Sequence, residues 1–222
     1  MKKKTSVSDD FHGYVKALWI CIASIPLAIV FIFLLVRLGF FGELPSTEEI
    51  TNPKSYLATE ILSSDGNQIG TFFHEKRVHV EYEEIPKNLI NALVSTEDER
   101  FFQHSGIDFR SLGRALISLG SGGGGSTITQ QLAKLMFTPD PARGILVRVL
   151  QKLKEWVIAI EIERRYTKQE ILTMYLNKFD FLYQAVGIHS ASNVYFGKNP
   201  IELNIEESAL LVGMWKNPSY YN

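Results

Sequence analysis

The chain has 222 residues, of which 45% are hydrophobic and 21% are charged. This composition fits one globular domain with some additional chain and excludes a mostly disordered protein. The 23 Lys and Arg residues nearly balance the 24 Asp and Glu residues, so the net charge of -1 indicates no strongly anionic partner such as duplex DNA. The single cysteine, Cys21, excludes an intramolecular disulfide framework and a multi-cysteine zinc site.

The first predicted element is a transmembrane helix. Residues 17–36 carry no charge, and a helix of about 20 apolar residues crosses a hydrocarbon core of ~30 Å. A cleaved signal peptide would have a shorter apolar region followed by a small-residue cleavage site, so we predict an uncleaved helix at residues 17–38. Membrane helices tolerate Pro26. Cys21 is interpreted as a small apolar side chain of this helix, with a palmitoylated or reactive thiol as the alternative.

The charges around this helix predict its orientation. Four lysines lie within residues 1–16, whereas Arg37 is followed by acidic residues from Glu43 onward. The positive-inside rule then makes residues 1–16 a cytoplasmic tail and places the rest of the chain outside. Glycine, proline and scattered acids in residues 39–56 are typical of a linker.

Residues 57–222 are predicted to form one mainly α-helical domain with a small β-hairpin at its start. A turn sequence at residues 63–67 separates LATEIL from QIGTFFHEKRVHVEY, which favours the hairpin. Beyond Pro86 the pattern becomes helical. Apolar residues then recur every four positions and place Glu97 in line with them, so we expect a half-buried carboxylate. The residues of this stripe are Leu89, Leu93, Glu97 and Phe101.

Later segments also carry helix signals. Thr167 with Glu170, and Asn204 with Glu207, have the spacing of capping boxes that begin helices. The helix predicted over residues 148–160 has apolar residues on one face and charged residues on the opposite face. The apolar set is Leu150, Leu153, Val157 and Ile160, and the charged set is Arg148, Lys152 and Glu155.

Several well-known functional motifs are excluded. The glycine-rich segment 120–126 has the spacing of a phosphate-binding loop, but Ser126 stands where that loop needs lysine. A weaker expectation remains, in which a helix beginning near Ser126 or Thr127 offers backbone N–H groups to an anionic oxygen. His74 and His79 have the wrong spacing for a metalloprotease motif and lie on a predicted strand.

Carboxylate chemistry is the better enzyme hypothesis, because neither S-x-x-K nor G-x-S-x-G occurs in the chain. Glu97 and Asp98 are adjacent, but neighbouring residues on a helix point about 100° apart, so they are not expected to share one role. The reactive carboxylate should be Glu97, which lies on the apolar stripe.

Five segments occur in a characteristic order: EDERFFQHSG (97–106), GGSTITQQLAK (124–134), QKLKE (151–155), ILTMYLN (171–177) and ESALLVGMWKNPSYYN (207–222). Together they resemble the five motifs of the peptidoglycan glycosyltransferases of family 51, found in class A penicillin-binding proteins and in monofunctional transglycosylases. The resemblance implies a lysozyme-like helical domain, tethered by one membrane helix, on the outer face of the bacterial cytoplasmic membrane. It implies polymerisation of lipid II into peptidoglycan glycan strands by inverting glycosyl transfer, with release of undecaprenyl pyrophosphate.

The resemblance also implies roles for individual residues. Glu97 takes the position of the general base and Glu155 that of the second essential carboxylate, while Lys152 is the cation near the pyrophosphate. The implied substrate-binding residues are Asp98, Ser126, Thr127, Gln130, Gln131, Lys134, Lys152 and Asn177. No organic cofactor is implied, and a divalent cation such as Mg or Mn is an open candidate. The implied partners are lipid II, the growing glycan strand, the membrane and other cell-wall synthesis proteins, without nucleic acid.

Three positions depart from the family pattern. Gln151 stands where arginine is usual, Leu135 where asparagine is usual, and Leu182 where glycine is usual. The missing arginine removes a bidentate phosphate donor, which Arg143 or Arg148 would have to replace.

Two rival functions stay open on the sequence. One is a lysozyme-like enzyme that cleaves finished glycan with Glu97 as an acid, and the other is a catalytically inactive scaffold in a cell-wall complex. The chain ends at Asn222, inside the region of the fifth motif, and has no transpeptidase signature. We therefore favour a fragment of a bifunctional protein, with a catalytic domain cut short at its C-terminus, over a short monofunctional form.

Overall fold

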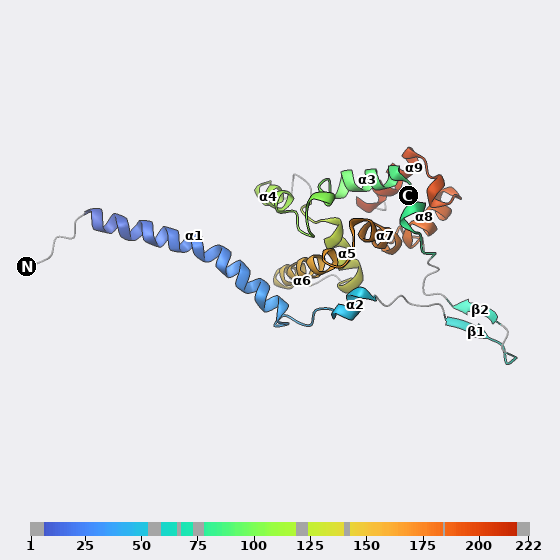
Figure 1. Ribbon diagram of the computed structural model, residues 1–222, viewed down its shortest axis with the longest axis horizontal. Helices are drawn as coiled ribbons and strands as arrows, with labels where there is room; N and C mark the ends of the chain where they lie inside the picture. The colour runs from blue at the N-terminus through green and yellow to red at the C-terminus, as the bar shows by residue number, and fades with distance from the viewer. Residues whose placement is uncertain are drawn as a thin grey trace, which may run out of the picture. The chain divides into compact units, whose positions relative to one another are not determined.

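The structure is a computed structural model that describes residues 7–52, 59–65, 68–72, 78–118, 124–139, 143–183 and 185–216. The chain divides into two units, Met1–Leu44 and Pro45–Asn222. Both are mainly helical, as predicted (Figure 1). The α-helices are α1 Val7–Arg37, α2 Thr47–Thr51, α3 Lys87–Glu97, α4 Phe109–Ile117, α5 Ile128–Phe137, α6 Ile145–Glu163, α7 Lys168–Lys178, α8 Gly187–Phe196 and α9 Ile205–Lys216. The strands are β1 Thr59–Leu62 and β2 Gln68–Phe72, and short 3-10 helices lie at Tyr82–Glu84, Phe101–Gln103 and Pro200–Glu202.

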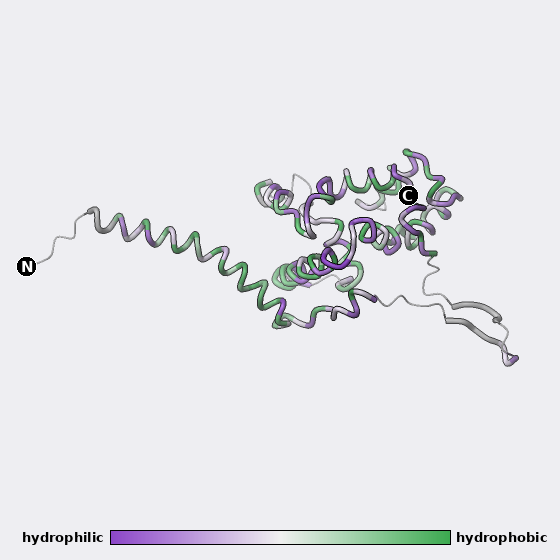
Figure 2. The backbone as a smooth tube through the Cα atoms, in the orientation of Figure 1, coloured by the Kyte–Doolittle hydropathy of each residue, from purple (hydrophilic) through white to green (hydrophobic). Residues whose placement is uncertain are grey.

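The first unit contains the long apolar helix α1. Its segment Phe11–Arg37 is long and apolar enough to cross a membrane, and Figure 2 shows apolar residues continuing along its C-terminal part. The helix begins at Val7, before the expected Ala17, and so includes the polar residues that precede the apolar segment. Cys21 is a free cysteine on this helix.

Part of the expected linker belongs to the second unit. Helix α2 is capped by Ser46, whose hydroxyl accepts from the Glu49 N–H at 3.2 Å while the Glu49 carboxylate accepts from the Ser46 N–H at 2.8 Å. Ile50 is buried, and its carbonyl accepts a hydrogen bond from Tyr166 at 2.9 Å. The linker prediction for residues 39–56 therefore overlooked a capping signature that was present in the sequence.

Strands β1 and β2 pair in antiparallel fashion in the stretch where the hairpin is expected. Thr59 pairs with Phe72 and Ile61 with Gly70, and the register shifts between Ile61 and Leu62. The expected second strand reached Tyr82, but residues 78–81 have no regular structure. His79 lies in this irregular segment, while His74 and Glu75 fall outside the described residues.

The core of the second unit forms where its longer helices pack in pairs. Helix α5 contacts both α6 and α7, α3 contacts α9, and α7 contacts α8 (Figure 1). Burying these side chains supplies the main stabilisation, at roughly 1.5–3 kcal/mol for each large apolar group. The fully buried large side chains include Leu89, Leu93, Phe101, Ile128, Leu132, Ile162, Ile171, Leu172, Tyr175, Leu176, Phe181 and Ile188.

Two helix faces decide where the carboxylates lie. In α3, Leu89 and Leu93 are buried and Glu97 is half-buried as the last helical residue, which confirms the stripe. In α6 the buried residues are Glu155, Ile158, Ala159 and Ile162. Burial therefore does not follow the apolar face expected for this helix: α6 packs against α5, and its buried residues include Glu155.

The predicted helix starts are confirmed. Thr167 and Glu170 form a reciprocal capping box at α7. Asn204 and Glu207 do the same at α9, with hydrogen bonds of 2.8 and 2.9 Å. Thr127 caps α5, so that helix begins where the sequence placed it. Each such cap is worth about 1 kcal/mol.

The loop after α7 places position 182, where the resemblance implies glycine, in a left-handed conformation. Leu182 has a φ of 67° and Tyr183 a φ of 49°, inside a turn closed by the bridge between Asp180 and Val186. The left-handed conformation costs a non-glycine residue about 1–2 kcal/mol, whereas glycine adopts it freely.

We expect Leu182→Gly to raise the free energy of unfolding by about 0.5–1 kcal/mol, since the relief of backbone strain exceeds the entropy that glycine adds to the unfolded chain. Thermal melting should show a rise of about 2–4 °C per kcal/mol. Leu182→Ala is the matched control, because it shortens the side chain but keeps the strain. A glycine variant no more stable than the alanine variant would contradict this account.

Candidate active site

One large cavity lies among the segments that carry the motifs. Its volume is about 900 Å³, and its aromatic wall consists of Tyr175, Phe179 and Trp215. Except for Asn177, every site residue predicted from the sequence lines it. The lining members of that set are Glu97, Asp98, Ser126, Thr127, Gln130, Gln131, Lys134, Lys152 and Glu155.

Glu97 lies at the C-terminal end of α3 and is fixed by a neighbouring amide. Its Oε2 accepts a hydrogen bond from Gln131 Nε2 at 2.8 Å. The Oε1 of Gln131 in turn accepts from the Tyr175 hydroxyl at 2.6 Å. These two hydrogen bonds connect helices α7, α5 and α3. They end on Glu97, the carboxylate that the sequence predicts to be reactive.

Glu155 and Lys152 form an ion pair on α6. Lys152 Nζ lies 3.0 Å from Glu155 Oε2 and donates to Ser126 Oγ at 2.9 Å. The side chain of Glu155 is only 5% exposed, whereas that of Lys152 is 38% exposed. A buried carboxylate is stable only when it is paired with a cation. The ion pair with Glu155 therefore keeps the ammonium group of Lys152 at the edge of the cavity.

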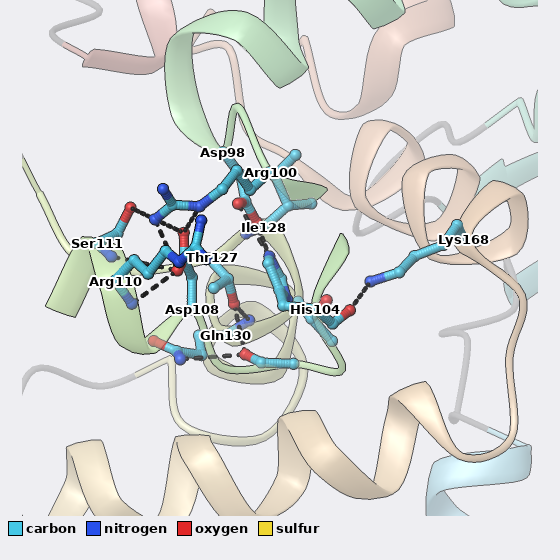
Figure 3. Close-up of polar contacts among 12 residues, drawn as sticks. Asp98, Arg100, His104, Asp108, Arg110, Ser111, Thr127, Ile128, Gln130 and Lys168 are labelled. Carbon is cyan, nitrogen blue, oxygen red and sulfur yellow. Dashed lines mark hydrogen bonds and ion pairs between the residues drawn. The ribbon is translucent and has the colours of Figure 1, made fainter. Parts of the chain in front are cut away.

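Asp98 is buried and makes its hydrogen bonds to other residues of the protein. Its two oxygens lie 3.0 Å from His104 Nε2, and Oδ2 accepts the N–H of Ile128 at 3.0 Å (Figure 3). Ile128 is the first residue of α5, so Asp98 places a negative charge at the positive end of that helix. The anionic oxygen that was expected at this helix start is therefore the carboxylate oxygen of Asp98, not an oxygen of a ligand.

Thr127 and Gln130 are buried and tie α5 to the first motif. The Thr127 hydroxyl and Gln130 Nε2 both donate to the carbonyl of Gly106, at 2.7 and 3.1 Å (Figure 3). Gly106 has a φ of +90°, and a Cβ at this position would lie 3.0 Å from the backbone of Ala159. Only glycine lets the loop approach α6 this closely.

Lys168 anchors the same loop from α7. Its Nζ donates to the carbonyl of His104 and to Glu163, each at 2.7 Å, and lies 4.2 Å from the centre of the Phe101 ring. Figure 3 shows this ammonium group directed at the His104 backbone. The loop between α3 and α4 is thus held from two helices, which fixes the position of Glu97 at its start.

Arg100 and Asp108 form a second ion pair in the cavity wall, and sequence reasoning missed it. Arg100 Nη2 lies 2.7 Å from Asp108 Oδ2, and Asp108 also accepts the N–H groups of Arg110 and Ser111 at 3.0 and 3.2 Å. Burial disfavours ionisation, but the hydrogen bonds from Arg100 and Ser111 outweigh it and lower the pKa of Asp108 to about 2. Asp108 is therefore ionised at neutral pH and compensates the charge of Arg100.

Further cations line the cavity from α5 and α6. Lys134 and Arg148 both contribute to the lining, and both are exposed. Gln151 donates to the carbonyl of Thr138 at 3.0 Å. Arg143 is exposed and does not line this cavity. Of the two arginines considered as replacements for the missing one, Arg148 is therefore the one at the cavity.

Asn177 has a different environment from the other predicted residues. Its amide group pairs with the backbone of Val80, accepting from the N–H at 3.0 Å and donating to the carbonyl at 2.9 Å. It also donates to the carbonyl of Thr173 at 2.9 Å. These contacts fasten the segment before α3 to α7.

Comparisons with known proteins identify the family of this chain. A profile described as transglycosylase matches residues 65–222. The chain belongs to the transglycosylase family. It is 38% identical over 184 residues to penicillin-binding protein 1A of Escherichia coli K12, covering 81% of this chain and 21% of that protein.

Two further relatives give the same result. Penicillin-binding protein 1A of Aquifex aeolicus is 38% identical over 93% of this chain and 28% of its own length. Penicillin-binding protein 1F of Bacillus subtilis is 40% identical over 75% of this chain and 23% of its own length. The chain thus spans between 21% and 28% of the length of these three relatives.

In this member of the family, sequence reasoning missed the aromatic wall and the Arg100–Asp108 pair. Tyr175 lies within the fourth segment and Trp215 within the fifth, and the rings of Phe179 and Trp215 contact each other at a tilt, with centroids 4.5 Å apart. The only signal in the sequence was the clustering of aromatic residues near the ends of α7 and α9. Such clusters are usual in cores as well as in sites.

The carboxylates of this cavity do not fit a resident metal ion. The described part of the chain contains no cluster of three or more His, Cys, Asp or Glu side chains placed to hold one. Glu155 is paired with Lys152, and Asp108 with Arg100, so their oxygens already have cationic partners.

Proposed function

We propose that this chain is the catalytic part of a peptidoglycan glycosyltransferase, which polymerises lipid II into glycan strands and releases undecaprenyl pyrophosphate. One observation carries the proposal: a half-buried carboxylate, Glu97, shares a cavity of about 900 Å³ with the Lys152–Glu155 pair and with Lys134 and Arg148. A base and several cations are what this reaction requires.

The chemistry follows from the leaving group. A diphosphate departs as a stable anion, so it needs positive charge more than a proton donor. Glu97 accepts the proton of the acceptor sugar's 4-hydroxyl while that oxygen attacks the anomeric carbon of the donor. The new C–O bond forms as the bond from the anomeric carbon to the diphosphate oxygen breaks, and the electron pair leaves with the diphosphate. Attack from the opposite side inverts the configuration, which gives a β-linkage.

Cations stabilise the charge that develops on the diphosphate. Lys152 is oriented for this by Glu155 and Ser126, and Lys134 and Arg148 lie on the same cavity. Gln151 donates its hydrogen bond to the carbonyl of Thr138, whereas Arg148 lines the cavity. We therefore assign to Arg148 the role that arginine at position 151 has in the family pattern.

The remaining predicted residues receive supporting roles in this proposal. Gln131 positions Glu97, while Asp98, Thr127 and Gln130 hold the start of α5 against the first motif. Asn177 fixes the segment before α3.

The proposed location follows from the substrate, which is anchored in lipid. We propose a lysozyme-like catalytic domain at residues 57–222 on the outer face of the cytoplasmic membrane, with residues 1–16 in the cytoplasm. A single span at about residues 17–38 would carry it, supported by the length of the apolar segment in α1. Other cell-wall synthesis proteins are the proposed macromolecular partners.

The test is incubation of the purified chain with labelled lipid II in detergent. We expect glycan strands to accumulate with release of the lipid diphosphate. Cleavage of finished glycan in the absence of lipid II would instead identify a glycosidase. Binding of labelled lipid II without turnover would identify an inactive scaffold.

A further inference from the structure

We propose that Tyr175 is a positioning residue that acts through Gln131 to orient the carboxylate of Glu97. The inference rests on the proposed function, in which Glu97 is the base. It adds Tyr175, to which neither the motif comparison nor the composition gave a role, and it assigns a direction to the hydrogen bonds between the three residues.

The three side chains come from separate helices and meet end to end. Tyr175 of α7 donates to Gln131 Oε1 at 2.6 Å, and Gln131 of α5 donates from Nε2 to Glu97 Oε2 at 2.8 Å. Both distances are within the range of strong hydrogen bonds. All three residues line the cavity, so this series of hydrogen bonds runs along the cavity wall.

The hydrogen bonds can run in only one direction. A carboxylate only accepts, so the NH2 group of Gln131 must face Glu97 and its carbonyl oxygen must face Tyr175. The Tyr175 hydroxyl proton then satisfies that carbonyl. Without this proton the amide loses the contact that opposes its rotation, and a rotated amide would place its oxygen against the Glu97 carboxylate.

Tyr175 is well suited to anchor these hydrogen bonds because its ring is packed on neighbouring aromatic rings and its hydroxyl does not ionise. Its side chain is fully buried, and its ring lies 5.9 Å from Trp215 and 6.0 Å from Phe179 between centroids. Burial, and then the negative charge of Glu97, raise the pKa of Tyr175. The hydroxyl therefore stays protonated at neutral pH and remains a donor.

The consequence for Glu97 is that its two oxygens have different roles. Among the described residues, Gln131 supplies the hydrogen bond at Oε2, and Oε1 is left for the acceptor hydroxyl. A general base must lie within about 2.6–3.2 Å of the proton it removes. Small errors in such placement cost large factors in rate, so the loss of the Tyr175 proton should reduce turnover more than substrate binding.

The first experiment is Tyr175→Phe in the lipid II polymerisation assay. This variant removes one oxygen and keeps the ring that packs on Trp215. We expect kcat to fall about tenfold, with KM for lipid II unchanged within about twofold. Tyr166→Phe is the matched control, because it also removes a bonded hydroxyl but lies away from the cavity, and it should retain full activity.

A double-mutant cycle separates positioning from a structural role. Gln131→Met has nearly the same volume as glutamine but makes no hydrogen bond to Glu97, so it should lower kcat by at least as much as Tyr175→Phe. Adding Tyr175→Phe to Gln131→Met should then change kcat by less than about twofold, because the path to Glu97 is already broken. Additive losses would overturn the inference, and so would a Tyr175→Phe variant with normal kcat.

The outcomes also distinguish this inference from the proposed function. A wild-type chain that polymerises lipid II while Tyr175→Phe is fully active keeps the function and rejects the positioning role. A wild-type chain that does not polymerise lipid II rejects both. If Tyr175→Phe lowers the melting temperature, the cycle still decides, since a purely structural loss would add to the effect of Gln131→Met.

Discussion

Glu97→Gln should abolish chain growth on lipid II while leaving the fold intact. An amide cannot accept the proton of the acceptor hydroxyl, and general-base assistance contributes about 10²–10⁴ in rate. The fold should survive because Glu97 is half-buried at the end of α3, and the amide oxygen of glutamine can still accept from Gln131. The rate of glycan formation and the melting temperature, measured on the same preparation, check both parts.

A matched control keeps this result specific to the site. Glu83→Gln makes the same change at an exposed position in the 3-10 helix before α3 and should leave the rate unchanged. Labelled lipid II should still bind to Glu97→Gln, because the cations of the cavity are untouched. A near-normal polymerisation rate would remove Glu97 from the mechanism, and the glycan-cleaving and scaffold functions would then need to be tested first.

The features that sequence predicted well are set by local spacing. The i, i+4 stripe of α3 fixes the half-burial of Glu97 because both depend on the helical period. The cap at Thr127 follows from the preference of threonine for that position, and Lys152 and Glu155 share a face, as expected, because residues three apart are neighbours on a helix. Each of these needs only one helix and its own geometry.

The features that sequence missed depend on which helices meet. The Arg100–Asp108 pair joins a turn to the start of α4, and Tyr175 reaches Glu97 only because α7 packs against α5. A helical pattern shows which residues share a face but not what lies against it. That limit also explains α6, where the buried face carries Glu155 instead of the apolar residues expected there.

Lys152→Ala should reduce kcat/KM for lipid II by about 10²–10³, the usual cost of removing one group that stabilises developing negative charge. It should also lower the melting temperature by several degrees, because the buried Glu155 carboxylate loses its partner at 3.0 Å. The two effects have different causes, so a second substitution can separate them. Lys154→Ala on the same helix is the control, since Lys154 does not line the cavity.

Combining Lys152→Ala with Glu155→Gln separates stability from transfer. The double variant has no unpaired buried charge, so its melting temperature should return toward that of the wild type. Its rate should stay low, because the cation that faces the diphosphate is still absent. Recovery of the rate along with the melting temperature would show that Lys152 serves only to neutralise Glu155, and the charge on the leaving group would then have to be stabilised by Lys134 and Arg148 alone.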